Sequence, residues 1–547
     1  MGIYLNPNND SFQMMLNTDT YVDKSMLINY TNEIFATEKR FACVSRPRRF
    51  GKSVNLNMLS AYYSKGCNSR KMFEKLKIAE NTDWDKHLNK YNVIHINMQE
   101  FLSNSSSMDE LLDLLERSLL WDLIDEFGDV RLFDDKNLSR TMKDIYNQKR
   151  IKDKDGNEKS IPFVILIDEW DCIFREHSND KEAQKKYLDF IRNWLKDKNY
   201  VALAYMTGIL PIKKYGTHSA LNMFDEYSMT NSGKLSEYTG FTEKEVAELC
   251  ERYHKNPDEM RYWYNGYQIN SSVHLYCPKS VISAIDMGKY DNYWSRTETY
   301  EALAKYIAMD MDGLHNAAEQ LLAGQKIKID INTFQNDMTS MQSRDDVLTL
   351  LIHLGYLSYL QETEEVYIPN KEVRGEFVVG MRAEGKWGKC IEAIQQSKEV
   401  LELTLNRKSA DVAEYIEKIH RENCDPKHYN NEQALRYTVL ISYFYAREKY
   451  MIIQEMPSGN GFVDILLLPN FRNPTGIPII IELKYNQSAD SAIEQIKNRN
   501  YPDIIKDYNK ILLVGINYNK ILLVGINYNK NSKDKKHECK IEEYTMN

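Results

Sequence analysis

The chain has 547 residues, of which 42% are hydrophobic and 27% are charged. This length allows several domains, and this composition is typical of folded globular proteins rather than of disordered chains. The formal net charge of −8 gives no overall positive field, so nucleic-acid binding would require a local basic surface. No apolar run approaches the ~20 residues that a membrane-spanning helix needs, and the N-terminus lacks a basic and apolar leader. We therefore expect a cytoplasmic protein with no membrane partner.

The segment from 41 to 59 has the order strand, loop, helix that a nucleotide-binding loop requires. An apolar run at 41–44 leads into the loop SRPRRFGKS at 45–53, and 54–59 continues as a helix. Arg46 stands where such loops usually have their first glycine. Because a short Gly-Lys-Ser sequence also occurs by chance, an ordinary helix start is the alternative interpretation.

The end of this loop carries residue types that bind phosphate. Gly51 lets the backbone approach a phosphate, Lys52 reaches the β- and γ-phosphates of ATP, and the Ser53 hydroxyl can hold Mg²⁺. Arg48 and Arg49 are candidates for further phosphate contacts, although exposed loop arginines are often only solubilising. The loop therefore predicts a site for ATP and Mg²⁺.

A second segment supplies acidic groups for the same chemistry. Residues 161–167 form a nearly continuous apolar run, as in a strand that is buried on both faces of a parallel sheet. Asp168 and Glu169 follow, and we expect Asp168 to hold Mg²⁺ and Glu169 to polarise the attacking water. A buried strand with a solvated acidic end is the alternative. Thr207 follows another apolar strand and could sense the γ-phosphate or be structural.

Strands and helices alternate in the N-terminal part of the chain. Apolar strands are predicted at 41–44, 93–96, 163–167 and 201–206, with helical stretches between them. This alternation predicts an α/β fold with a parallel sheet and helices on both of its faces.

The middle part of the chain is predicted to be mainly helical. Thr242 followed by Glu245 forms a capping box, and a helix at 345–354 can end at Gly355. A hairpin from 357–360 and 366–369 follows. A helix followed by a hairpin suggests a winged-helix-like element, which could bind DNA or could be a packing module.

Near the C-terminus, two predicted strands bring a second set of polar residues together. The strands at 461–468 and 479–484 form a plausible hairpin, and Glu482 and Lys484 point to the same face of their strand. Asp464 on the neighbouring strand could meet them. Asp464 and Glu482 could hold Mg²⁺, and Lys484 could position or activate water, as a metal-dependent phosphodiesterase requires.

Ten residues near the C-terminus are repeated without change. Residues 508–517 recur at 518–527, and a third copy begins at 528–530. Repeat architectures have longer periods and divergent copies, so this identity indicates a recent duplication or a sequence error. We expect one copy to occupy a sheet position, with the other either paired beside it or displaced.

The motifs together resemble the bacterial AAA-ATPase-like family, whose members commonly carry a C-terminal PD-(D/E)XK nuclease-like domain. The resemblance rests on the segments 21–25, 46–53, 167–171, 207–209, 264–267 and 368–374. Arginine in place of the first loop glycine is usual for this family. The resemblance implies a P-loop NTPase domain at 1–235, a helical or winged-helix-like region at 236–400, and an α/β restriction-endonuclease-like domain at 401–547.

The C-terminal region both matches and departs from the nuclease pattern. Glu432 lies where the fold often carries an extra acidic group, and Gln495 resembles the glutamine motif of the family. Relatives often have arginine two residues before the aspartate, and Phe462 stands there in this chain. A nuclease-like fold without cleavage activity therefore remains an alternative.

The resemblance implies an ATPase whose nucleotide state controls a metal-dependent nuclease acting on nucleic acid, DNA more than RNA. ATP and Mg²⁺ would be its cofactors, and a homo-oligomer is possible. The alternative is a nucleotide-dependent switch or scaffold whose C-terminal domain binds a partner and cleaves nothing.

Overall fold

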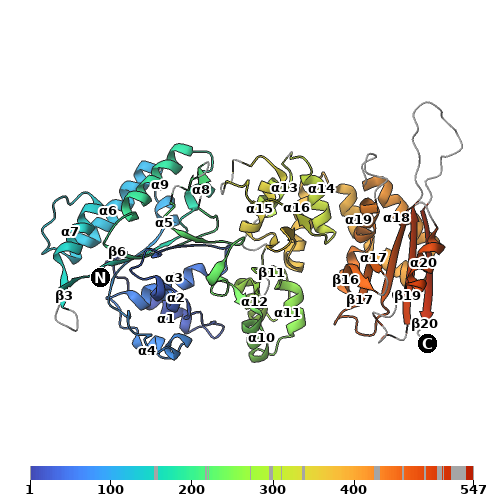
Figure 1. The fold of residues 1–547 in the computed structure, drawn as a ribbon, viewed down its shortest axis with the longest axis horizontal. Helices are drawn as coiled ribbons and strands as arrows, with labels where there is room; N and C mark the ends of the chain where they lie inside the picture. Colours follow the sequence, from blue (N-terminus) through green and yellow to red (C-terminus); the bar gives the residue numbers. More distant parts are fainter. Residues whose placement is uncertain are drawn as a thin grey trace. The chain divides into compact units, whose positions relative to one another are not determined.

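The computed structural model divides the chain into two compact units, Met1–Leu314 with Lys326–Gly375, and His315–Gln325 with Glu376–Asn547. Figure 1 shows the helices and strands coloured by their position in the sequence. The described residues are 2–152, 158–212, 214–215, 218–219, 221–270, 273–294, 300–309, 311–335, 339, 341–423, 432–458, 461–485, 488–499, 501, 505, 508, 510–518 and 537–545. The domain boundaries given above stay a prediction.

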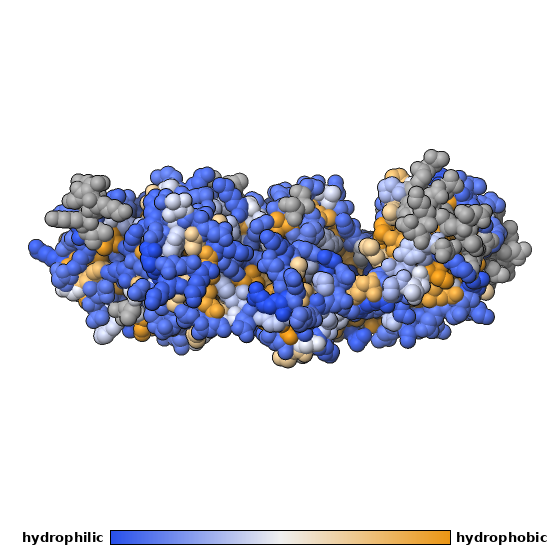
Figure 2. Space-filling model, turned by 90° about the horizontal axis from the view of Figure 1, so that it is seen from below, coloured by the Kyte–Doolittle hydropathy of each residue, from blue (hydrophilic) through white to orange (hydrophobic). Residues whose placement is uncertain are grey.

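The face of the molecule in Figure 2 is mainly hydrophilic, with hydrophobic residues in small separate areas. Among the described residues, no helix has both the length and the apolar composition needed to cross a bilayer.

A five-stranded parallel sheet forms the centre of the first unit. Its order is β2-β5-β6-β1-β9, and every neighbouring pair is parallel. Its strands are β1 (Phe41–Ser45), β2 (Asn92–Asn97), β5 (Phe163–Asp168), β6 (Val201–Gly208) and β9 (Asp225–Tyr227). The four predicted strands are thereby confirmed. Because β1, β5 and β6 end at the same edge, the residues that follow them meet there.

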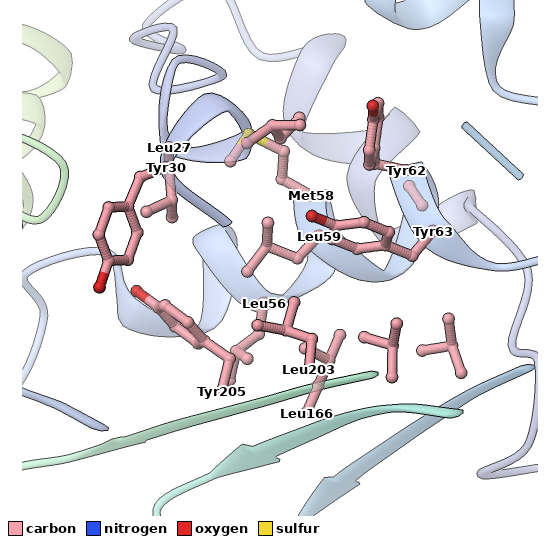
Figure 3. Close-up of a cluster of buried hydrophobic side chains, with 14 of the residues drawn as sticks. Leu27, Tyr30, Leu56, Met58, Leu59, Tyr62, Tyr63, Leu166, Leu203 and Tyr205 are labelled. Carbon is pink, nitrogen blue, oxygen red and sulfur yellow. The ribbon is translucent and has the colours of Figure 1, made fainter. Parts of the chain in front are cut away.

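Helices cover both faces of this sheet (Figure 1). On one face, α3 (Lys52–Tyr63) packs Leu56 against Leu166 and Leu203 of the strands, within one buried cluster (Figure 3). The other helices of this part are α1 (Asp10–Leu16), α2 (Leu27–Ile34), α4 (Arg70–Phe73), η1 (Lys77–Glu80), α5 (Met98–Ser103), α6 (Met108–Glu126), α7 (Leu138–Gln148), α8 (Cys172–Glu176) and α9 (Lys181–Leu195). The expected α/β fold is thus confirmed.

Short strands also occur outside the elements that were predicted from the sequence. β3 (Arg150–Lys152) pairs with β4 (Glu158–Ser160) at the two ends of the charged segment before β5. β7 (Lys214–Tyr215) pairs with β8 (His218–Ser219), and η2 (Gly233–Leu235) follows β9. These strands are too short to show an alternating pattern in the sequence.

The remainder of the first unit combines helices with two small sheets. α10 (Glu243–Arg252) begins with the predicted Thr242–Glu245 capping box, and α15 (Arg344–Leu354) ends at Gly355, whose φ is +87°. β14 (Ser358–Leu360) and β15 (Glu365–Tyr367) form the predicted hairpin. The other elements are β10 (Phe241–Thr242), α11 (Pro257–Tyr264), β11 (Tyr267–Gln268), β12 (His274–Tyr276), α12 (Pro278–Asp286), α13 (Tyr300–Ile307) and β13 (Ile327–Lys328). α14 (Leu314–Leu322) belongs to the second unit from its second residue on, and α16 (Lys371–Glu384) begins in the first unit and continues into the second.

The second unit contains a mixed sheet of order β16-β17-β18-β19-β20. β17 and β18 are antiparallel, and β18 and β19 are parallel. Its elements are α17 (Gly388–Leu405), α18 (Ser409–Asn423), α19 (Glu432–Ser442), η3 (Phe444–Glu448), β16 (Tyr450–Ser458), β17 (Gly461–Pro469), β18 (Ile479–Tyr485), α20 (Ala489–Asn498), β19 (Lys510–Tyr518) and β20 (His537–Thr545). A mixed sheet with helices agrees with the expected restriction-endonuclease-like domain.

The first copy of the repeated sequence forms β19, which lies between β18 and β20. Both hydrogen-bonding edges of β19 are therefore occupied. The second copy, apart from its first residue Tyr518, lies outside the described residues. The two alternatives for this copy, pairing beside the first copy or displacement, stay a prediction.

Candidate functional site

The loop between β1 and α3 has the backbone shape of a phosphate cradle. Arg49 and Gly51 adopt left-handed conformations, with φ of +65° and +89°. Gly51 directly precedes α3, so the free amide groups at the start of this helix face the loop. The side chains of Arg48 and Arg49 are exposed. The loop therefore offers backbone donors, with two accessible arginines beside them.

Lys52 is buried under the loop and bonded to it. Its Nζ donates to the carbonyl oxygens of Arg46 and Pro47, at 3.0 Å each. Burial lowers the pKa of Lys52, and the carboxylates of Glu169 and Asp168 act in the opposite direction. Since both bonds end on carbonyl groups of the loop, a phosphate could replace these acceptors without breaking an ion pair.

Arg46, which stands in place of the first glycine, supports the loop from below. The side chain is fully buried, and Nη1 donates to the carbonyl oxygens of Ser45 at 2.9 Å and Tyr227 at 3.1 Å. Burial lowers the pKa of Arg46 to about 10. Arg46 thus ties the end of β1 to the end of β9, a role the sequence alone did not indicate.

Asp168 is the point where three elements meet. The hydroxyls of Ser53 on α3 and Thr207 on β6 donate to opposite oxygens of Asp168, each at 2.5 Å. The backbone N–H of Glu169 also donates to Asp168, at 3.0 Å. Ser53, Asp168 and Thr207 are therefore brought together as one cluster. A hydroxyl and a carboxylate in this arrangement have the oxygen ligands that Mg²⁺ prefers.

Glu169 follows Asp168 but is held by a different partner. Its φ is +51°, and its carboxylate forms an ion pair with Arg175 of α8. Burial raises the pKa of Glu169, whereas the charges of Lys52 and Arg175 lower it. Arg175 also lies 3.3 Å from Asp171 through Nε. Sequence reasoning missed Arg175, although its position four residues after Asp171 was a signal for a helical ion pair.

Asp171 fixes the chain after β6 to the acidic end of β5. It is fully buried, and Oδ2 accepts from the backbone N–H groups of Ile209 at 3.1 Å and Leu210 at 2.8 Å. A Cβ on Gly208 would lie 2.6 Å from Oδ1 of Asp171 and 2.7 Å from Trp170. The glycine after Thr207 is therefore needed for this close packing.

An apolar pocket opens beside the start of α3. It is lined by Met15, Thr20, Tyr21, Val22, Lys24, Phe50, Gly51, Val54, Asn55, Tyr238, Gly240, Phe241, Pro278 and Ile282. Lys24 lies at this pocket and is ion-paired with Glu245 at 2.6 Å, which fastens the N-terminal segment to the capping box of α10. A flat and mainly apolar ring system would suit such a lining.

The second cluster lies where β17 and β18 separate. Their ladder extends to Ile465 opposite Ile481, and Asp464 and Glu482 follow on the two strands. Oδ2 of Asp464 accepts from the backbone N–H of Leu483 at 2.7 Å. Arg436 of α19, which sequence reasoning missed, approaches Oδ1 of Asp464 to 3.5 Å. The predicted strand pair therefore places both carboxylates at one sheet position.

Glu482 is the most buried acid of this cluster, with 2% of its side chain exposed. Oε1 accepts from Nζ of Lys484 at 3.0 Å and from Nε2 of Gln495. Burial and the charge of Asp464 raise the pKa of Glu482 to about 7, although Lys484 and Arg499 lower it. Oε2 is buried and has no hydrogen-bond partner among the described residues. A buried oxygen of this kind fits a metal ligand.

Asp464 and Glu482 are the acids of this site that the structure describes. The described part of the chain contains no group of three or more histidine, cysteine or acidic side chains that could hold a metal ion. The side chain of Glu432, at the start of α19, lies outside the described residues. A cation at this site would thus have two carboxylates from the described residues, with water completing its shell.

The family comparisons agree with both halves of this description. The model of the family described as predicted AAA-ATPase matches residues 9–217, and the model of the PD-(D/E)XK nuclease superfamily matches residues 430–538. The two models match separate parts of the chain. The resemblance inferred from the sequence is thereby confirmed.

Individual relatives are distant. An uncharacterized protein in the vnfD 5′ region of Azotobacter chroococcum mcd 1 is 24% identical over 349 residues, 60% of this chain and 61% of that protein. The structure of the Aeropyrum pernix ORC2 protein, in ADPNP–ADP complexes, is 9% identical with a TM-score of 0.26, over 69% of this chain and 94% of that one. The crystal structure of CDC6P from Pyrobaculum aerophilum is 11% identical with a TM-score of 0.21, and the match covers 66% of this chain and 93% of that one.

Proposed function

We propose that the AAA-ATPase-like domain binds and hydrolyses ATP. The observation that carries this proposal is the convergence of Ser53 and Thr207 on Asp168, beside the buried Lys52. Lys52 would exchange its loop carbonyl partners for phosphate oxygens. Ser53 and Asp168 would hold Mg²⁺, which supplies positive charge against the phosphates. Thr207 would sense the γ-phosphate from the end of β6.

Glu169 would orient the attacking water. To do so its carboxylate must be ionised and must turn from Arg175 towards the nucleotide. Arg48 and Arg49 are exposed on the same loop and would contact phosphate oxygens. The apolar pocket beside α3 would take the base, between Tyr21, Phe241 and Ile282.

For the C-terminal domain we propose metal-dependent cleavage of nucleic acid, with DNA as the substrate. Asp464 and the partnerless oxygen of Glu482 would hold Mg²⁺, which supplies a Lewis acid at the phosphodiester. Lys484 would position or activate water, and its contact with Glu482 keeps it at the site. Gln495 orients Glu482 through its amide. Control of cleavage by the nucleotide state is the remaining part of this proposal.

A nucleotide-dependent switch or scaffold is the second candidate. The observation that favours it is Phe462, which is 61% exposed at the position where relatives often have arginine. A site that lacks a phosphate contact could bind nucleic acid or another partner without cleaving it. A cytoplasmic location and self-association also stay proposals. Light scattering, which measures the mass of the particle in solution, tests self-association.

One set of assays separates these candidates. ATP hydrolysis and Mg²⁺-dependent DNA cleavage are measured for the wild type, Lys52→Ala and Lys484→Ala. We expect Lys484→Ala to abolish cleavage and leave ATP hydrolysis within about twofold, and Lys52→Ala to abolish hydrolysis. ATP turnover by a wild type that cleaves neither DNA nor RNA would favour the switch. Absence of ATP binding would exclude both.

A further inference from the structure

The start of β17 lacks the cation that the nuclease pattern leads one to expect. Phe462 carries no charge, and its side chain is largely exposed two residues before Asp464. Cleavage of a phosphodiester needs a donor that binds the phosphate and draws charge from it. If the domain acts on nucleic acid, another residue must supply this donor.

Arg499, directly after α20, lies beside the start of β17. Its Nη1 donates to the hydroxyl of Tyr501 at 3.3 Å. A Cβ on Gly461 would lie 2.6 Å from the same Nη1 and 2.9 Å from the Tyr501 hydroxyl. The guanidinium group therefore lies over Gly461, the residue before Phe462.

Arg499 is also connected to the carboxylate pair. Nε2 of Gln495 donates both to Glu482 and, at 3.3 Å, to the hydroxyl of Tyr501 that receives Arg499. Tyr501 is fully buried, so it fixes the geometry between the two sides. These hydrogen bonds place Arg499 close to the proposed cleavage position.

The other cations at this site are already paired with acids. Arg436 forms ion pairs with Glu455 and Asp464, and Lys484 pairs with Glu482. Arg499 is exposed and forms no ion pair among the described residues. A guanidinium group has five N–H donors in a planar fork, so donors remain for an incoming phosphate.

We propose that Arg499 binds a backbone phosphate of the nucleic-acid substrate beside Asp464 and Glu482, in place of the arginine that Phe462 replaces. This inference rests on the proposed nuclease function of the C-terminal domain. It makes Arg499 a substrate-binding residue supplied by the end of α20 rather than by β17. Gly461 is the position that leaves room for it.

The first test measures DNA binding by the full-length chain without cleavage. Lys484→Ala, which is expected not to cleave, serves as the parent protein and is titrated with a fluorescein-labelled DNA duplex in Mg²⁺. When Arg499→Ala is introduced into this parent, we expect the affinity for DNA to fall about tenfold. The plot of the logarithm of the binding constant against the logarithm of the salt concentration should become less steep by about one, since one phosphate contact is lost. Arg499→Lys should retain part of the affinity.

Two further variants in the same parent separate a phosphate contact from bulk charge and from misfolding. Lys497→Ala removes one positive charge from the last turn of the same helix and should change binding less than about twofold. Gly461→Ala keeps Arg499 but pushes its guanidinium aside, so binding should weaken several-fold. Thermal melting of each variant reports on the fold.

The second test follows cleavage in proteins that retain Lys484, where Arg499→Ala should raise KM for DNA with ATP hydrolysis unchanged. Equal DNA affinity of parent and Arg499→Ala would overturn the inference while leaving the proposed nuclease function in place. Equal losses in Lys497→Ala and Arg499→Ala would also overturn it, because bulk charge would then explain both. A parent that binds neither DNA nor RNA would reject the proposed nucleic-acid function itself, and this inference with it.

Discussion

Glu169 is the residue that would orient the attacking water at the proposed ATP site. It is held in a left-handed backbone conformation and ion-paired with Arg175, while burial raises the pKa of its carboxyl group. Only the ionised carboxylate can accept a proton from water. Arg175 therefore has two opposite effects on this proposed role, since its charge favours the ionised carboxylate and its ion pair holds that carboxylate in place.

Replacement of Arg175 by alanine tests the first of these effects. A carboxylate that loses a neighbouring cation becomes harder to ionise, so the pKa of Glu169 should rise further. We expect the acidic limb of the ATPase rate profile of Arg175→Ala to move to higher pH than in the wild type. The measurement is kcat for ATP hydrolysis across the pH range.

The matched control is Arg192→Ala, which removes an arginine whose side chain is 40% exposed and paired with Asp189 on α9. Its profile should coincide with that of the wild type. A limb that stays in place or moves to lower pH in Arg175→Ala would contradict the assigned role of Arg175.

Glu482 gives a second pH dependence at the scale of one residue. Its pKa is raised from 4.5 to about 7, so the carboxyl group gains its charge only as the pH rises through neutrality. Mg²⁺ competes with this proton, and its affinity should increase between about pH 6 and about pH 8, with release of protons on binding. Calorimetric titration of Mg²⁺ in buffers of different ionisation enthalpy measures both quantities.

Glu482→Gln keeps the shape of the side chain but has no proton to exchange. Its weaker Mg²⁺ binding should not change over the same pH range. If the wild type bound Mg²⁺ equally well at both ends of the range, Glu482 would not be a ligand with a raised pKa.

The sequence identified the groups of each site whose spacing is fixed within one element or loop. Lys52 and Ser53 are adjacent after Gly51, Asp168 ends an apolar strand, and Glu482 and Lys484 alternate on one strand. The sequence did not reveal the roles of three arginines, because the partner of each depends on the direction of its side chain. The pairs are Arg46 with Tyr227, Arg175 with Glu169, and Arg499 with Tyr501. From the sequence, Arg46 was recognised only as the residue that stands in place of the first loop glycine.

At the scale of elements, the end of α15 packs directly on the loop between β1 and α3. A Cβ on Gly355 would lie 2.8 Å from Cβ of Pro47 in the loop. Tyr267 donates from its hydroxyl to the carbonyl oxygen of Gly355 at 2.8 Å and places its ring edge-on to Phe50, with the ring centres 5.2 Å apart. The end of the helix that precedes the predicted hairpin is therefore in direct contact with the loop.

Gly355→Ala should disturb this contact. The substitution adds strain at a φ of +87° and a clash with Pro47, so we expect a loss of about 2 kcal/mol or more in unfolding free energy. The displaced loop should also bind ATP more weakly. Denaturant unfolding and nucleotide titration measure the two effects.

Gly288→Ala provides the same kind of backbone strain without a contact, because Gly288 has a φ of +67° and no neighbouring atom within 4 Å of a Cβ there. It should cost only about 1 kcal/mol and leave ATP binding unchanged. Equal effects of the two substitutions on ATP affinity would mean that packing on Pro47 does not matter to the loop.

The duplicated segment gives another prediction about an element. Deletion of residues 518–527 brings Tyr528 to the place of Tyr518, so β19 keeps its sequence and its two partner strands. The connection to β20 becomes shorter, which costs less loop-closure entropy, about 0.6 kcal/mol for each halving of its length. We expect the deleted form to melt at an equal or slightly higher temperature, and a large fall in melting temperature would show that the second copy belongs to the core.

The sequence predicted the longer elements well because their hydrophobic signal is strong. β1, β5 and β6 contain continuous apolar runs, and α10 and α15 carry capping residues at their starts. β9 remained hidden because a short strand, Asp225–Tyr227, is defined by its pairing with β1 rather than by its residues. The paired ends of the charged segment, β3 and β4, were missed for the same reason.

At the scale of the whole molecule, the proposed control of the C-terminal domain can act through binding or through hydrolysis of ATP. Glu169→Gln should bind ATP but not hydrolyse it, because the amide cannot accept a proton from water, whereas Lys52→Ala should not bind ATP at all. DNA cleavage is then measured for both variants and the wild type, with and without ATP. The proposed nuclease site itself is altered in Lys484→Ala, so this variant gives the background rate of DNA cleavage.

If bound ATP is the signal, cleavage by Glu169→Gln should respond to ATP as strongly as the wild type, and the response should persist because the nucleotide is not consumed. Lys52→Ala should then show one constant rate with or without ATP. If hydrolysis is the signal, Glu169→Gln should behave like Lys52→Ala. Cleavage that is equal in all three proteins and indifferent to ATP would contradict any control of the nuclease site by the nucleotide, and would leave two domains that act independently.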